Sequence, residues 1–323
     1  MYVRAFSESR FCSISLFPAL EAEGSWPANN PITDYQALPV WVTLTLMTRI
    51  IPRQLFFTLA MLIFATLGHA QSTTSPPEDE PDFIVPARPT VSNPAEFQRA
   101  GVLQLEIGYD ANFHSKGNFD CQQDMPLALR FAISHRFLVE LDTDSPYSLK
   151  DPIGRRNTGA GDTQLGFQAV LFHENRSRPG VAFAYYIKFP TANRNKGLGT
   201  GRFDHSFIAL VSKKVSKTTV DFNAIYFIAG RTSGQGHASS VQVAIAASRN
   251  LTKKFGVQGE ISGSSRNDQQ AGTMFGLGVV TFQINRRTVF DSGLRFGLTP
   301  GAPRLGVVAG MTVGIANLYK KRH

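Results

Sequence analysis

Apolar and polar residues alternate with a period of two from about residue 101 to the C-terminus, and this pattern restricts the possible folds more than any other feature. In the first such stretch, Leu103, Leu105 and Ile107 alternate with Gln104 and Glu106. A period of two is typical of a β-strand whose two faces meet different surroundings. No stretch after residue 100 has a convincing helical period. The chain is therefore predicted to be an all-β protein.

Twelve stretches share this alternation, are rich in β-branched and aromatic residues, and are separated by clusters of Gly, Asn and Ser. Such residues are enriched in strands because they pack well on a pleated, half-buried surface. The predicted strands cover residues 101–111, 125–133, 137–148, 160–172, 180–190, 203–213, 218–230, 239–249, 255–264, 272–284, 288–298 and 305–317.

Short, basic connections between these strands alternate with longer, Gly-rich connections. Residues 212–217 and 250–254 are of the short kind, and residues 191–202 and 231–238 are of the long kind. This arrangement is typical of an antiparallel transmembrane β-barrel, which has short periplasmic turns and longer outer loops. An even number of strands places both termini on the periplasmic side. A soluble β-sandwich is the alternative, because its strands also have one buried and one solvated face.

Charged residues concentrate on one face of the predicted strands. A charge that faces lipid near the bilayer midplane costs roughly 2–4 kcal/mol, so these residues are predicted to face the lumen. We favour ion pairs that fill a narrow interior, and the alternative is a polar path or ligand site. The lumen-facing candidates are Glu106, Asp110, Arg130, Glu140, Asp142, Lys188, Asp221, Glu260, Asp291 and Arg295.

Residues 47–70 have the organisation of a secretory signal peptide. Arg49 and Arg53 form a positive region, residues 55–67 form a short apolar run, and residues 68–70 supply the small residues of a cleavage site. The apolar run is shorter than the roughly 20 residues that a bilayer-spanning helix needs. We therefore predict cleavage and export, and the alternative is an uncleaved membrane anchor.

The segments on either side of this signal follow from it. Residues 1–46 have no clear periodicity, so translation is predicted to start at Met47 and these residues to be a spurious extension. Residues 71–99 are rich in Pro, Ser, Thr and acidic residues, and they are predicted to form a flexible periplasmic segment. Residues 100–323 then form the barrel, and its predicted location is the bacterial outer membrane.

The composition excludes some classes of protein. Hydrophobic residues make up 42% of the chain and the mean hydropathy is -0.10, which excludes a helical membrane protein but not a barrel, whose strands expose only half their residues to lipid. The net charge of +9 would suit a nucleic-acid binder, but the basic residues recur in turns, as in Lys213-Lys214, so no nucleic-acid partner is predicted. Cys121 is expected in a loop without a disulfide, because Cys12 lies in the extension.

Few residues suggest catalysis. The sequence contains no HExxH, Walker or G-x-S-x-G motif and no CxxC pair, so no catalytic residue, metal or cofactor is predicted. The glycines near residues 159–161 and 197–199 are interpreted as turns, because neither set lies between a strand and a helix. His237 and Ser239 share one face of a predicted strand at an outer loop, and a barrel lipid hydrolase is therefore kept as a distant alternative.

Several short stretches carry a family resemblance. They are residues 88–90 (RPT), 101–109 (GVLQLEIGY), 159–166 (GAGDTQLG), 187–191 (IKFPT) and 197–201 (GLGTG). They resemble outer-membrane proteins of the MetA-pathway of phenol degradation family, and the similarity covers most of residues 85–323. The resemblance implies an outer-membrane, transporter-like barrel that helps small, often aromatic, compounds to cross, and it supplies no functional residues. One departure is the basic tail after Tyr319, where many barrels end in an aromatic residue.

Together these observations favour a passive channel or facilitator for small, hydrophobic or aromatic compounds, and not an enzyme. The alternative is a structural barrel that transports nothing. The expected partners are outer-membrane lipid, the outer-membrane assembly machinery and a small-molecule substrate.

Overall fold

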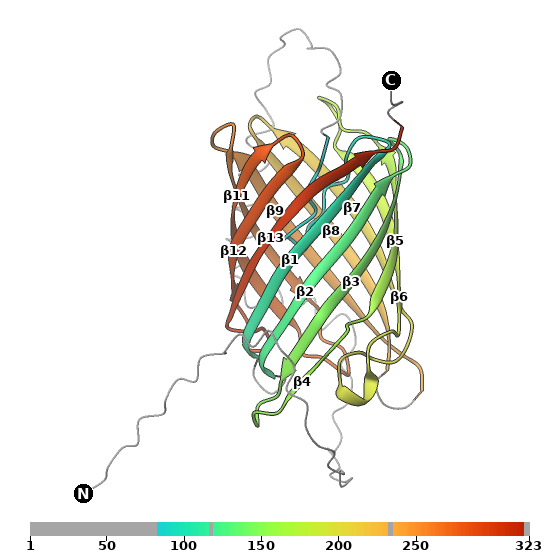
Figure 1. Cartoon of the computed structure of the whole chain (residues 1–323), viewed down its shortest axis with the longest axis vertical. Coiled ribbons are helices and arrows are strands. Elements are labelled where there is room, and N and C mark those ends of the chain that lie inside the picture. The colour runs from blue at the N-terminus through green and yellow to red at the C-terminus, as the bar shows by residue number, and fades with distance from the viewer. Residues whose placement is uncertain (1–82, 116–118, 232–234, 320–323) are drawn as a thin grey trace, which may run out of the picture. The chain divides into compact units, whose positions relative to one another are not determined.

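Long antiparallel strands, each paired with its neighbours in the sequence, form one closed sheet in the computed structural model (Figure 1). The structure describes residues 83–115, 119–231 and 235–319. The strands are β1 (Val102–Ser115), β2 (Phe119–Ala132), β3 (Phe137–Lys150), β4 (Arg156–Gly159), β5 (Thr163–Phe172), β6 (Gly180–Phe189), β7 (Asp204–Val215), β8 (Thr218–Gly230), β9 (His237–Asn250), β10 (Phe255–Ser264), β11 (Thr273–Asn285), β12 (Thr288–Gly297) and β13 (Leu305–Asn317).

The first and last strands close the barrel. β1 pairs with β2 on one side and with β13 on the other, from Val102 opposite Asn317 to Phe113 opposite Leu305. β4 is a four-residue strand that pairs only with the end of β3, so the wall itself consists of the other twelve strands. The prediction of a transmembrane β-barrel of about 12 strands is confirmed.

The largest differences from the predicted strands concern β2 and β4. β2 begins at Phe119 and not at residue 125, and β4 was not expected at all. In both places the sequence is polar, as in Asp120 and Gln122 of β2, and it lacks an apolar face that the alternation could mark. The long loop after β6 contains one 3-10 turn, Arg194–Lys196, which Asn193 caps.

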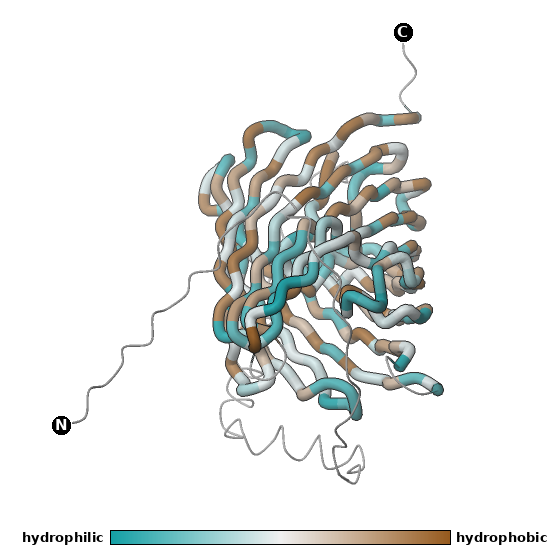
Figure 2. The backbone as a smooth tube through the Cα atoms, turned by 60° about the horizontal axis from the view of Figure 1, so that its bottom comes forward, coloured by the Kyte–Doolittle hydropathy of each residue, from teal (hydrophilic) through white to brown (hydrophobic). Residues whose placement is uncertain are grey.

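The two faces of the wall differ sharply in chemistry, and hydropathy alternates along the strands (Figure 2). On β10, Glu260 is buried whereas the side chain of Ile261 is 52% exposed. Apolar residues are therefore exposed on the outside, where a membrane would cover them, and polar residues line the inside. Exposed apolar residues on the outer face include Leu127, Leu141, Phe167, Phe183, Phe207, Phe222, Ile245, Val280, Phe290, Leu294 and Ile315.

A stretch of chain before β1 lies inside the barrel, and we call residues 83–100 the lumen segment. In Figure 1 it is the teal coil enclosed by the strands. Its residues contact β1, β5 and β10, which lie on different sides of the wall, through Val85, Ala95 and Ser92. Because these contacts come from around the whole circumference, the segment occupies the lumen and does not lie beside the barrel.

The predicted flexibility of residues 71–99 is therefore wrong for residues 83–99. The segment buries a few apolar side chains, among them Ala95 and Phe97, and polar side chains of the wall satisfy its backbone groups. These partners lie up to 168 residues away in the sequence, so local composition cannot indicate them. Residues 71–82, the predicted extension 1–46 and the predicted signal 47–70 lie outside the described residues.

Cys121 also differs from its expected setting. It lies on β2 and not in a loop, and it is 2% exposed. The loop setting predicted for Cys121 is therefore wrong.

Within residues 83–115, 119–231 and 235–319, no helix is long and apolar enough to cross a membrane.

Candidate functional site

The wall side chains of β1 pair with the lumen segment much as a neighbouring strand would. Gln104 accepts a hydrogen bond from the Val85 N–H at 3.0 Å and donates one to the Val85 carbonyl at 2.9 Å. Glu106, two residues further along β1, accepts one from the Ala87 N–H at 2.9 Å. The spacing of two in the strand thus matches a spacing of two in the segment, which fixes the register of the segment along β1.

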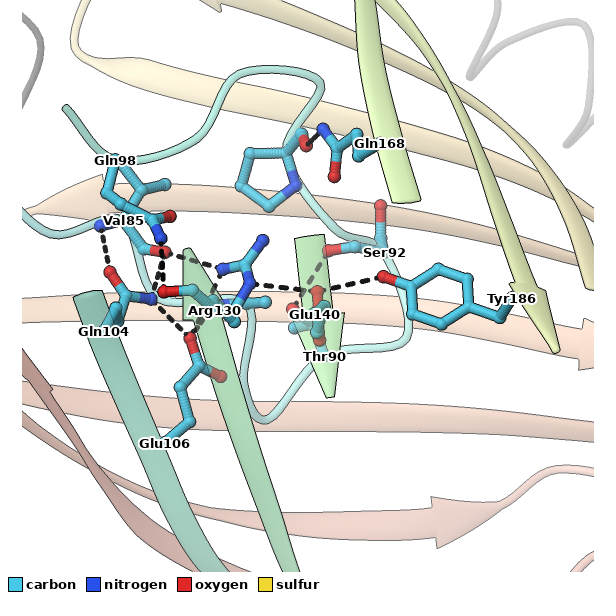
Figure 3. Close-up of polar contacts among 12 residues, drawn as sticks. Val85, Thr90, Ser92, Gln98, Gln104, Glu106, Arg130, Glu140, Gln168 and Tyr186 are labelled. Atoms are coloured by element: carbon cyan, nitrogen blue, oxygen red, sulfur yellow. Dashed lines mark hydrogen bonds and ion pairs between the residues drawn. The ribbon is translucent and has the colours of Figure 1, made fainter. Parts of the chain in front are cut away.

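A buried charge cluster lies where the segment enters the lumen (Figure 3). Arg130 on β2 is 1% exposed, and its guanidinium lies 3.1 Å from Glu140 on β3 and 3.4 Å from Glu106 on β1. The same guanidinium donates to the Val85 carbonyl at 3.0 Å, and the Tyr186 hydroxyl on β6 donates to Glu140 at 3.0 Å. A buried charge is tolerated only when it is paired and hydrogen-bonded, so the cluster and the segment stabilise each other.

Strands further around the wall hold the next part of the segment. Glu260 on β10 accepts a hydrogen bond from the Ser92 N–H at 2.7 Å. Gln168 on β5 donates to the Ala95 carbonyl at 3.0 Å, and Ser212 on β7 accepts from the Ala95 N–H at 2.8 Å. The backbone of the segment therefore finds the partners that a buried chain requires.

Two glycines make room for a charged side chain of the segment. Gly108 on β1 lies opposite Gly310 on β13. A Cβ atom on Gly108 would lie 2.0 Å from Arg88 Cζ, and one on Gly310 would lie 2.5 Å from Arg88 Nε. The guanidinium therefore rests directly on the backbone of these strands, where it donates to the Ala309 carbonyl at 3.1 Å and contacts Asp291 at 3.5 Å.

Small residues elsewhere on the wall provide the space that the segment fills. Ala95 is 0% exposed and packs in a cluster with Ala182, Ala184 and Leu210. A Cβ on Gly314 of β13 would lie 2.4 Å from the ring of Phe83. Twelve-stranded barrels are wider than eight-stranded barrels, whose own side chains fill the interior. In this barrel the lumen segment fills the remaining volume.

A second set of charges lies towards the long-loop end of the barrel. Arg295 on β12 pairs with Asp110 on β1 through two hydrogen bonds of 3.0 and 3.1 Å. Lys188 on β6 lies 2.6 Å from both Asp162 and Asp204. Within the described part of the chain these groups make no hydrogen bond or ion pair with the lumen segment, so they form a separate layer of the interior.

The structure thus brings the ten lumen-facing candidates into distinct places. Arg130, Glu106 and Glu260 bind the segment, Glu140 pairs with Arg130, and Asp291 contacts Arg88 of the segment. Asp221 accepts a hydrogen bond of 2.5 Å from Ser212, which itself holds the segment. The carboxylate of Asp142 has one buried oxygen, Oδ1, without a hydrogen-bond partner among the described residues. Asp110, Lys188 and Arg295 belong to the layer near the long loops.

Sequence reasoning missed the uncharged residues of the site. Gln104, Gln168 and Ser212 contact the segment, and so does Asn223, whose amide lies 2.7 and 3.0 Å from the N–H and carbonyl of Asn93 in the orientation that satisfies both. They lie on the same inward face as the charges, and amides can both donate to and accept from a backbone. Their position on the inward face, which follows from the period of two, was therefore the sequence signal that could have identified them.

The described residues give little support to a catalytic site. His237 and Ser239 are both exposed and share the outer face of β9, with buried Ala238 between them. No hydrogen bond joins them within the described part of the chain. Residues 83–115, 119–231 and 235–319 also contain no group of three or more His, Cys, Asp or Glu side chains placed to hold a metal ion.

These features define a transmembrane β-barrel whose interior is occupied by its own N-terminal segment. The model of the family described as "Putative MetA-pathway of phenol degradation" matches residues 87–313, and the chain belongs to this family. The match begins inside the lumen segment, so the family includes part of it as well as the barrel.

Three solved structures are similar to this chain, and the first of them supports the fold. The COG4313 outer membrane channel from Pseudomonas putida F1 is 14% identical, with a TM-score of 0.53 over 74% of this chain and 99% of that chain. The NanC porin is 8% identical, with a TM-score of 0.44 over 65% and 98%. The CymD monoaromatic hydrocarbon channel is 10% identical, with a TM-score of 0.39 over 69% and 90%. No curated protein matches the sequence.

Proposed function

We propose that this protein is an outer-membrane channel that lets small compounds, aromatic ones among them, cross passively, and that it is not an enzyme. The lumen segment is its internal constriction. The family description, which names phenol degradation, supports the aromatic substrate class. Outer-membrane lipid surrounds the apolar outer face, and the assembly machinery of that membrane inserts the barrel.

The observation that carries this proposal is that the lumen segment, together with the wall side chains that bind it, occupies the part of the lumen towards the short turns. Alanine and glycine line the wall beside the segment, as at Ala182, Ala184 and Gly310. A barrel with a purely structural role could fill its interior with larger wall residues. Here a shift of the segment would open a passage without unfolding a strand.

The contacts of the segment suit such a shift. Besides the apolar packing of Ala95 and Phe97, they are hydrogen bonds and ion pairs. Each net hydrogen bond, as at Gln104, Glu106 or Glu260, contributes about 0.5–1.5 kcal/mol. Groups released from the wall could bind water in an opened lumen. A structural barrel without transport is the second candidate, and the occupied lumen is the observation that favours it.

The test is conductance in planar bilayers combined with uptake of labelled phenol by cells. Replacing both Ala95 and Ser212 with cysteine introduces a reversible disulfide between the segment and the wall. The two residues are adjacent, because the Ala95 N–H lies 2.8 Å from Ser212 Oγ. We expect the oxidised double variant to conduct less than the two single variants, and deletion of residues 83–99 to raise conductance. Absence of conductance in all of these proteins would leave the structural role as the explanation.

We also propose that the chain is exported by residues 47–70 and matures at Gln71. The proposal rests on Arg49, Arg53 and the short apolar run that follows them. N-terminal sequencing of protein from outer-membrane fractions should yield Gln71. A chain that begins at Met1 or Met47 would exclude this processing.

A further inference from the structure

A large cavity opens at the short-turn end of the barrel, and we call it the inner vestibule. Its volume is about 1060 Å³, and the turn residues Asn250 and Arg286 form part of its rim. Phe83, where the lumen segment begins, and Tyr319, beyond the last strand, also line it. The vestibule therefore lies between the segment and the solvent on the side of the short turns.

Positive charge dominates the wall of the vestibule. Five arginines line it, Arg88, Arg99, Arg249, Arg286 and Arg287, against one acidic residue, Asp291. Asp291 is already in contact with Arg88. A cleft lined by charge of one sign concentrates ions of the opposite sign, so the cavity attracts anions more strongly than the exposed turns do.

The vestibule also offers ring surfaces beside these charges. The guanidinium carbon of Arg287 lies 4.6 Å from the centroid of the Phe83 ring. Tyr319 is fixed by a hydrogen bond of 2.8 Å from its hydroxyl to the Ile133 carbonyl. Arginine binds carboxylates through two parallel N–H donors, and aromatic rings pack against one another at their edges and faces. A ligand with both a ring and a carboxylate would use both features.

We propose that the inner vestibule binds small aromatic carboxylates. This inference deepens the proposed channel function, on which its physiological meaning rests, by adding a negative charge to the substrate class. The volume of about 1060 Å³ is slightly above the roughly 300–1,000 Å³ typical of small-molecule sites, so a single aromatic ring fits with room to spare. In the layer near the long loops the charges are paired instead, Asp110 with Arg295, and Asp162 and Asp204 with Lys188. The excess of positive charge is therefore a feature of the vestibule and not of that layer.

Binding is measured by isothermal titration of the full protein, purified from outer membranes in detergent, with benzoate. Benzamide keeps the ring without the charge, and acetate keeps the charge without the ring. We expect both to bind at least tenfold more weakly than benzoate, and benzoate binding to weaken as salt screens the arginines. Equal affinity for benzamide would overturn the role of the arginines, and equal affinity for acetate would overturn the role of the rings.

Variants locate the site. Replacing Arg286→Gln together with Arg287→Gln should weaken benzoate binding at least tenfold. Arg136→Gln, in a short turn outside the cavity, is the matched control and should bind benzoate as the wild type does. Unchanged binding in the double variant, with normal heat-modifiable mobility on gels, would overturn the proposal.

The acidic residues just before the segment provide a further control. Glu78, Asp79, Glu80 and Asp82 precede Phe83 in the sequence and could compete for the same arginines. Benzoate binding to the wild type supports the proposal, whereas binding that appears only after these four residues are changed to Gln or Asn would overturn it. Because binding is measured without transport, a protein that binds benzoate but does not conduct would refute the channel and leave the site intact.

Discussion

Arg130 on β2 and Glu140 on β3 form a buried ion pair in the lumen, with 3.1 Å between guanidinium and carboxylate and side chains that are 1% and 8% exposed. The pair joins two wall strands and, through Val85, anchors the lumen segment to them. One arginine therefore couples the stability of the wall to the position of the segment.

Replacing Arg130→Leu should destabilise the barrel strongly. The change leaves Glu106 and Glu140 buried without their cation, and removing one partner of a buried pair costs about 3–5 kcal/mol. Folding into lipid vesicles, followed by heat-modifiable gel mobility, measures the loss. Arg136→Leu, at an exposed turn, is the control and should fold normally. Equal stability of the two variants would contradict the assigned role of Arg130.

The outer face of the wall, unlike the lumen, should not tolerate a charged side chain. Ile261 lies near the middle of β10, next to Glu260, and its side chain is 52% exposed. Ile261→Arg should cost roughly 2–4 kcal/mol because it places a charge against lipid, whereas Ile261→Leu should change little. The measurement is again folding into vesicles. A harmless arginine at this position would mean that this face does not contact lipid.

How far the sequence predicts this structure depends on the range of the interactions. The alternation at Leu103 to Ile107 reports local geometry, so the strands, their faces and the closed barrel could be predicted from it. The position of the lumen segment depends instead on pairs such as Ser92 with Glu260, which are 168 residues apart. Polar, Pro-rich composition predicts flexibility when such partners are unknown. A search for charged residues also misses Gln104 and Gln168, which bind the segment through uncharged amides.

The topology of the strands leads to a labelling prediction. Single cysteines at Lys214, at the end of β7, and at Lys253, in the short turn after β9, should resist an impermeant thiol reagent applied to whole cells. This end of the barrel is assigned to the periplasm. A cysteine at Asn195, in the long loop after β6, should react. Labelling at the first two positions but not at the third would reverse the orientation, and equal labelling at all three would argue against a membrane barrel.

The glycine pair beneath Arg88 gives the most direct control over the lumen segment. A side chain at Gly108 or Gly310 would overlap the guanidinium, since the added Cβ atoms would lie 2.0 and 2.5 Å from its atoms. Gly108→Val and Gly310→Val should therefore displace Arg88 while leaving the backbone pairing of β1 with β13 in place, because valine is favoured in strands.

We expect both variants to conduct more than the wild type in planar bilayers, and to expose residues 83–100 to added protease. Gly278→Val on β11 is the matched control, because a Cβ at Gly278 meets nothing within 4 Å, and it should behave as the wild type does. If Gly108→Val and Gly310→Val folded normally with unchanged conductance and protease resistance, the segment would not be the constriction. Increased conductance in the Gly278 control as well would attribute the effect to the barrel wall and not to Arg88.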